Sequence, residues 1–255
     1  MNASIDQLVT QCATLRELHQ RGNPIVLPNV WDAASARAVV AADYRVVATS
    51  SGAVAWSLGF EDHQRAPVDE MFAAAARIVA AVDVPVTVDA EAGYGLAPAE
   101  LVERLRFVGA AGMNLEDTDH ETGTLRPIDD HAAWLRAVRS AAADAGVPLV
   151  INARVDSFLV DRDRDQTSSV DDAVTRANAY LAAGADCVYP ILLGEPSARD
   201  AFIDAVDGPV NLLSWPGGAS VAELAAAGAA RISFGGTLHR VVMAAFTDAL
   251  DAIGA

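Results

Sequence analysis

The chain has 255 residues and a mass of 26.5 kDa, enough for one large domain or two small ones. Apolar residues make up 52% of the sequence and charged residues 20%, which excludes an intrinsically disordered chain. Acidic residues outnumber basic residues by 34 to 18, and such a negative charge argues against nucleic acid or an anionic membrane as a partner.

The residue types that are missing exclude several chemistries. All 18 basic residues are arginine, so the chain lacks the lysine that a Schiff-base aldolase, a pyridoxal-phosphate enzyme or a Walker A loop needs. The two cysteines, Cys12 and Cys187, do not suggest a disulfide framework. The first twenty residues do not resemble a signal peptide, and no apolar run is long enough to cross a membrane. These features predict a soluble, cytoplasmic protein.

Strand-like and helix-like segments alternate along the chain after a leading amphipathic helix at residues 5–21. The expected strands are short, apolar and rich in β-branched residues, as buried parallel strands are. They lie at residues 25–27, 45–49, 84–89, 113–116, 149–154, 187–191, 210–213 and 231–234. The expected helices lie at residues 33–42 (with Asp32 as N-cap), 69–81, 98–110, 129–145, 170–183, 197–206, 220–227 and 237–252.

This alternation predicts an α/β fold in which helical crossovers join parallel strands. Eight strand–helix units in about 250 residues favour a (β/α)8 TIM barrel with a leading N-terminal helix, and a single domain over residues 1–255. A doubly wound open sheet is the alternative. It needs a glycine-rich turn after the first strand, but the turn at residues 28–32 contains no glycine.

Acidic side chains follow neighbouring strands at the end where barrel enzymes carry their chemistry. Asp89 and Glu91 lie at the end of the third expected strand, and Glu116 ends the fourth. Three acids at one barrel mouth repel one another unless a cation lies between them. Oxygen ligands without cysteine or histidine suit Mg²⁺, or Mn²⁺, with water completing the coordination. The alternative is that each acid caps a helix or is a solvated loop charge.

The fifth strand ends in Arg154, which could orient a substrate carboxylate or stabilise an enolate oxygen. An ion pair to Asp156 or Glu116 is the alternative, and it is compatible with a functional role. Glycines follow the seventh and eighth strands at residues 217–218 and 235–236, where many barrels bind phosphate. Glycine is also common in tight turns for backbone reasons alone.

Four motifs resemble those of the isocitrate lyase/phosphoenolpyruvate mutase superfamily and occur in the superfamily's order. They read SSGA at residues 50–53, VDAEAGYG at 88–95, NLED at 114–117 and NARVD at 152–156. Supporting matches read SA at 35–36 and LGFED at 58–62, so the resemblance spans nearly the whole chain. It implies a Mg²⁺-dependent barrel enzyme that acts on a 2-oxo or 2-hydroxy carboxylate through a pyruvate-like enolate.

The resemblance also implies a set of metal ligands. Asp89 matches the main ligand, and Asp62 matches an acid that helps to close the metal site. Glu91 stands where the superfamily usually has aspartate, and together with Glu116 it would hold the ion partly through water.

Substrate contacts are implied in the same way. The loop that receives the substrate's carboxylate and oxyanion matches Ser50, Ser51 and the backbone N–H groups of Gly52 and Ala53. Arg154 matches the arginine that contacts the substrate's carboxylate or its leaving portion. The superfamily is usually tetrameric, and the apolar last helix is compatible with a homo-oligomer, a dimer or tetramer.

The chain departs from the superfamily in its lid. Lyases carry a Lys-x-Cys-Gly motif there, and its cysteine is the general acid. The corresponding residues 117–127 contain neither lysine nor cysteine, and they also lack the Asn and Ser of the phosphonomutase lid. After the sixth strand, Ile191 stands where the superfamily has His or Glu. The metal-binding half is therefore matched, whereas the half that sets reaction and substrate is altered.

Three residues are candidates for the missing proton donor. His120 and Glu121 lie in the altered lid, and histidine transfers protons well near neutral pH. Tyr94 could reach the site as a phenol. The alternatives are a solvated loop position for His120 and a packing role for Tyr94.

The expected function is a Mg²⁺-dependent lyase that cleaves a carbon–carbon bond of a small carboxylate. Two alternatives stay open. One is carbon–phosphorus chemistry, as a mutase or hydrolase of the phosphonopyruvate type. The other is a non-catalytic relative that still binds metal and small carboxylates.

Overall fold

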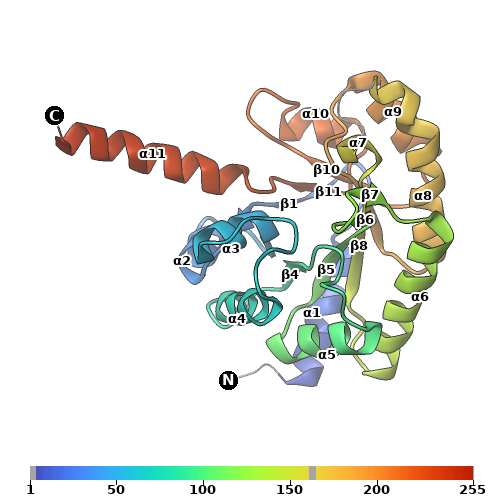
Figure 1. Cartoon of the computed structure of the whole chain (residues 1–255), viewed down its shortest axis with the longest axis horizontal. Helices are drawn as coiled ribbons and strands as arrows, with labels where there is room; N and C mark the ends of the chain where they lie inside the picture. The colour runs from blue at the N-terminus through green and yellow to red at the C-terminus, as the bar shows by residue number, and fades with distance from the viewer. Residues whose placement is uncertain (1–3, 161–164, 255) are drawn as a thin grey trace.

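Helices and strands alternate throughout the described part of this computed structural model, residues 4–160 and 165–254 (Figure 1). The main helices are α1 (Ile5–Glu17), α2 (Ala33–Ala41), α3 (Ser51–Leu58), α4 (Val68–Val79), α5 (Pro98–Val108), α6 (Ile128–Asp144), α8 (Val170–Ala182), α9 (Pro196–Ala205), α10 (Val221–Ala226) and α11 (Thr237–Gly254). Short turns α7 (Ser157–Val160) and η1 (Gln166–Ser169) precede α8. The strands are β1 (Ile25–Leu27), β2 (Asn29–Val30), β3 (Val47–Thr49), β4 (Val86–Asp89), β5 (Gly112–Glu116), β6 (Thr118–Asp119), β7 (Thr124–Leu125), β8 (Val150–Val155), β9 (Cys187–Pro190), β10 (Asn211–Leu213) and β11 (Arg231–Ser233).

The parallel strands close into a barrel. Six of them pair in the order β2-β3-β4-β5-β8-β9, and three pair as β1-β11-β10. A bridge between Val188 and Val210 joins β9 to β10. On the other side, β1 and β2 are one strand interrupted at Pro28, which has no N–H to donate to a ladder. The predicted (β/α)8 barrel is confirmed, and the open sheet is excluded.

Local sequence explains how each helix begins and which face it buries. The predicted N-cap Asp32 accepts from the Ser35 N–H at 2.7 Å. The Ser35 hydroxyl in turn accepts from the Asp32 N–H at 3.1 Å, which completes a capping box. In α4, Met71, Ala75 and Ile78 recur at helical spacing, and all three are buried against the barrel.

Three segments differ from the sequence prediction. The first helix ends at Glu17 with Leu18 as its C-cap, not at residue 21, and the chain then turns through Gly22 with φ 73°. Residues 51–58, for which no helix was expected, form α3 directly after β3, with Ser50 as its N-cap. The lid at residues 117–127, for which no strand was expected, contains an antiparallel hairpin of β6 and β7.

The barrel interior beneath the mouth is unusually polar. Arg231 is 1% exposed, and its Nη2 donates to Asn114 Oδ1 at 3.1 Å. The same oxygen accepts from Asn152 Nδ2 at 2.9 Å. Barrel cores are usually filled by branched apolar side chains. This network instead fixes Asn114, whose amide reaches the mouth above it.

The last helix leaves the barrel. Figure 1 shows α11 projecting as a rod away from the other helices. Its apolar side chains, including Val242, Phe246 and Ile253, are exposed. No helix of the described residues is long and apolar enough to cross a membrane.

Candidate active site

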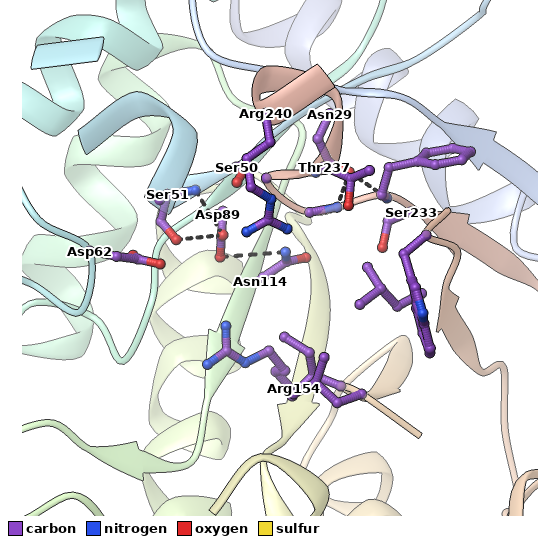
Figure 2. A pocket seen from close by; sticks show the side chains of 18 of the residues that line it. Asn29, Ser50, Ser51, Asp62, Asp89, Asn114, Arg154, Ser233, Thr237 and Arg240 are labelled. Carbon is purple, nitrogen blue, oxygen red and sulfur yellow. Dashed lines mark hydrogen bonds between the residues drawn. The ribbon is translucent and has the colours of Figure 1, made fainter. Parts of the chain in front are cut away.

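A cavity of about 880 Å³ opens at the carboxyl ends of the barrel strands. The residues that line it include Asp62, Asp89, Glu91, Glu116 and Arg154. They come from three neighbouring strands and from the loop after α3, so the barrel closure brings distant segments of the chain to one mouth. Figure 2 shows Asp62, Asp89 and Arg154 among them.

Asp89 ends β4 and is held from two sides. Its Oδ2 accepts from the Ser51 N–H at 2.9 Å and from the Ser51 hydroxyl at 2.7 Å. Its Oδ1 faces Asn114 Nδ2 at 3.5 Å, as Figure 2 shows. The carboxylate therefore has one orientation, set by α3 and by the polar layer beneath it.

Glu91 follows in a strained conformation. Its φ is 49°, in the left-handed region that a residue with a long side chain rarely adopts. Its Oε2 accepts from the Gln64 N–H at 2.6 Å. Burial, followed by the charges of Glu116, Asp89 and Asp62, raises the pKa of Glu91 to about 8.

Glu116 ends β5 and is contacted by a histidine and an arginine. His120 Nε2 lies 2.6 Å from Glu116 Oε1, and Arg154 Nη1 lies 2.6 Å from Oε2. Burial still raises the pKa of Glu116 above its usual range, and Arg154 opposes that shift. Converging carboxylates whose charged forms are disfavoured are the environment that a bound cation relieves.

The donor set fits a divalent cation. One atom each of Glu91, Glu116 and His120 can be chosen so that all lie within 4.8 Å of one another. Asp89 and Asp62 line the same cavity. Carboxylate oxygens suit Mg²⁺ and Mn²⁺, and an imidazole ligand favours Mn²⁺ over Mg²⁺. The four acids expected as ligands are thus brought together, and His120 joins them.

The expected substrate loop is the first turn of α3. Ser50, Ser51 and Gly52 line the cavity. The Ala53 N–H donates to the Ser50 hydroxyl at 3.4 Å, and Ser50 thereby caps the helix. A Cβ on Gly52 would lie 2.6 Å from Asp62 Oδ2, which explains why glycine lets this turn approach the acid.

Arg154 is occupied by carboxylates. In addition to the ion pair with Glu116, Arg154 donates from Nε and Nη2 to the two Asp156 oxygens at 2.6 and 2.8 Å. Asp156 also accepts from Thr118 at the start of the lid. The structure therefore contains the ion pairs that the sequence offered as an alternative role for Arg154. Through them Arg154 holds the Glu116 carboxylate in position.

The lid hairpin is anchored beneath by buried groups. Asp117 Oδ2 accepts from the Tyr180 hydroxyl at 2.7 Å and from Arg176 at 3.2 Å. Neither Glu121 nor His120 is among the residues that line the cavity. Glu121 lies at the exposed hairpin turn, whereas His120 contacts the lining residue Glu116.

Tyr94 lies below the site. Its ring packs 6.0 Å from Phe72, and burial raises its pKa well above the usual value. It lines a small separate pocket that also touches Asp89. This position fits a packing role for the ring, and the hydroxyl also contacts the Glu91 carboxylate.

Several lining residues were not among the site residues expected from the sequence. Trp215 follows β10, Tyr189 lies in β9, His63 follows α3, and Arg240 comes from α11. Figure 2 shows the Arg240 side chain directed from α11 into the cavity. Loops and helix ends carry no periodicity, so among these four residues only Tyr189, which lies on a strand, could have been anticipated.

Comparison with known proteins agrees with this geometry. Residues 15–254 match the sequence profile of the phosphoenolpyruvate phosphomutase family. An uncharacterized Mycobacterium tuberculosis protein is 32% identical, over 94% of this chain and 88% of the relative. The 2-methylisocitrate lyase of Escherichia coli is 30% identical, over 74% of this chain and 64% of the lyase. A solved Burkholderia cenocepacia chain, described as a candidate phosphonomutase, is 40% identical with a TM-score of 0.90, over 94% of this chain and 99% of that one.

Proposed function

The chain belongs to the isocitrate lyase/phosphoenolpyruvate mutase superfamily, and on that premise we propose that it is a Mg²⁺-dependent lyase. Its substrate is a small 2-oxo or 2-hydroxy carboxylate, and the bond that breaks is carbon–carbon. The similarity to 2-methylisocitrate lyase supports this reaction class. Mn²⁺ is the alternative ion.

The convergence of Asp89, Glu91 and Glu116 with Asp62 at one mouth carries the proposal. Asp89, Glu91 and Glu116 would hold the cation, with His120 beside them. When bound, the cation supplies a Lewis acid for the oxygens of the substrate's carboxylate end.

The chain's own residues then bind and orient the substrate. The first turn of α3, with Ser50 and Gly52, offers a helix N-terminus to a carboxylate. Arg240 adds a positive charge from above. Arg154 holds Glu116 in place, and the hairpin carries His120 as the candidate proton donor.

A substrate screen tests the reaction. 2-Methylmalate, oxaloacetate, isocitrate-type acids and phosphonopyruvate are incubated with the Mg²⁺-loaded protein, and pyruvate or glyoxylate is detected. We expect turnover of at least one carbon acid, and loss of that turnover in EDTA. Full activity in EDTA-stripped protein contradicts the metal dependence.

Carbon–phosphorus chemistry is the second candidate, supported by the similarity to the candidate phosphonomutase. A phosphonate dianion needs more cationic partners than the cavity offers, because Arg154 is already paired with Glu116 and Asp156. Phosphonopyruvate turnover in the screen would favour this candidate. Tight oxalate binding without any turnover would favour a non-catalytic relative.

We also propose a single barrel domain over residues 1–255 that acts as a cytoplasmic homo-oligomer. Both cysteines are free and fully buried, which agrees with a reducing compartment. The exposed apolar side chains of α11 support an oligomer.

A further inference from the structure

The cavity has two chemically different sides. The acids come from β4, β5 and the loop after α3, on one arc of the barrel. The opposite arc is lined mainly by apolar side chains that lie at the end of β10 or shortly after β8, β9, β10 and β11. These are Leu159, Ile191, Leu192, Leu213, Trp215 and Phe234.

Trp215 on the apolar side of the cavity is packed closely by two glycines. A Cβ on Gly194 would lie 2.8 Å from its indole Cη2, and a Cβ on Gly218 would lie 2.7 Å from its Cε2. Glycine at both positions lets two loop backbones pack against the ring. The indole is therefore held between these loops and presents a fixed apolar surface to the cavity.

Positive charge is scarce around the cavity. Among the described lining residues, Arg154 and Arg240 are the arginines. Arg154 is paired with Glu116 and Asp156, which leaves that group negative overall. Arg240 lies 5.7 Å over the Trp56 ring and has no ion pair within the described residues. One available arginine suits one carboxylate.

We propose that the substrate carries a single carboxylate at its reacting end and an uncharged, apolar substituent of several carbons at the other. The carboxylate lies between the α3 N-terminus and Arg240, and the substituent packs on Trp215. This inference rests on the proposed function and narrows its substrate class. A cavity of about 880 Å³ is in the range that holds drug-sized ligands, more than a three-carbon acid fills.

Binding to the Mg²⁺-loaded protein, measured by calorimetry, tests the proposal without requiring turnover. The probes are pyruvate, 2-oxoglutarate and 2-oxo-4-phenylbutanoate. We expect the phenyl acid to bind at least about tenfold more tightly than pyruvate, because apolar area is buried on Trp215. We expect 2-oxoglutarate to bind more weakly than the phenyl acid, because its second carboxylate meets an apolar wall.

Two variants locate the effect. Trp215→Ala should abolish the advantage of the phenyl acid and leave pyruvate affinity unchanged. Leu192→Asn makes the same wall polar at a residue with φ 63°, a conformation that asparagine tolerates, so the fold is retained. Tyr44→Ala, outside the cavity, is the control and should leave the binding of all three probes unchanged.

The outcomes separate the two proposals. If none of the acids binds in the presence of Mg²⁺, the proposed function fails together with this inference. If pyruvate binds and 2-oxoglutarate binds more tightly than the phenyl acid, the proposed function stands and the apolar-substituent inference is overturned. Unchanged phenyl-acid affinity in both wall variants also overturns it.

Discussion

Asp89 has the most closely defined environment of the carboxylates at the barrel mouth. Ser51 and Asn114 orient it, so replacing it removes charge from a prepared position. Asp89→Asn keeps the side-chain volume and removes one ligand charge. We expect Mg²⁺ affinity to fall by at least about 100-fold, since even outer partners of metal ligands contribute 10- to 100-fold. Calorimetric Mg²⁺ titration measures the change.

Asp171→Asn is the matched control for that substitution. Asp171 is exposed on the first turn of α8, away from the cavity. Its replacement should leave the Mg²⁺ titration unchanged. Equal Mg²⁺ affinity in Asp89→Asn and the wild type would remove Asp89 from the ligand set.

His131 makes the folded state sensitive to acid. It is fully buried between Trp134 and Tyr180, neither ring nitrogen has a hydrogen-bond partner among the described residues, and burial lowers its pKa to about 3. Below about pH 6.5 this histidine is protonated in the unfolded chain but stays neutral in the folded chain, so the free energy of unfolding decreases as the pH falls toward 3.

His131→Phe removes this protonation difference. Relative to the variant, the wild type should lose about 3 kcal/mol of unfolding free energy between pH 7.5 and pH 4.5. At pH 7.5 the variant should be at least as stable, because no hydrogen bond is lost. Urea unfolding at the two pH values measures both effects. Parallel pH profiles for the two proteins would contradict this account.

Single residues were predictable where they lie on strands and not where they lie in turns. Asp89 and Glu116 end strands, so the barrel geometry alone brings them together. Glu121 and His120 are neighbours in sequence, yet the hairpin turns one outward and the other onto Glu116. Trp215 owes its position to two glycines from different loops, which no spacing along the chain reveals.

At the scale of elements, the β6–β7 hairpin links the site to the outer helices. Asp117 and Thr118 are bonded to Tyr180 and Asp156, so the hairpin is attached at its base. His120 then projects onto Glu116 Oε1. His120→Ala should weaken Mg²⁺ binding about tenfold and lower kcat about 100-fold, because Glu116 loses its partner and the site a proton donor.

Glu121→Ala is the control within the same hairpin, and it should change neither quantity. Mg²⁺ affinity and kcat are measured for both variants on the substrate found in the screen. A large loss of kcat with intact Mg²⁺ affinity would assign His120 to proton transfer alone. Unchanged values for both would leave the hairpin without a part in the site.

The elements themselves were mostly predictable, because buried parallel strands and amphipathic helices have distinct patterns. The elements that were not predicted have physical reasons for showing no pattern. The first five residues of α3 are buried whichever side of the helix they lie on, so no amphipathic pattern identifies this short helix. The two-residue strands β6 and β7 are too short to show alternation. Only the pairing across residues 118–125 makes them strands.

At the scale of the whole molecule, α11 is the least supported part of the fold. It stands away from the barrel, and Val242, Phe246 and Ile253 are 51%, 55% and 82% exposed. An isolated helix of 18 residues is marginal in water, since most helical stability in proteins comes from packing of an apolar face. A second copy of the chain would supply that packing.

We therefore expect a mass of at least twice 26.5 kDa by light scattering at micromolar concentration. Phe246→Glu places a charge in the apolar surface of α11 and should shift the protein toward the monomer. Because α11 also carries Arg240 and Val241 into the cavity, the monomeric variant should bind pyruvate more weakly as well. Asp248→Asn, an exposed polar change on the same helix, should alter neither property. A monomeric wild type would show that α11 is stable without a partner, and pyruvate affinity would then be independent of protein concentration.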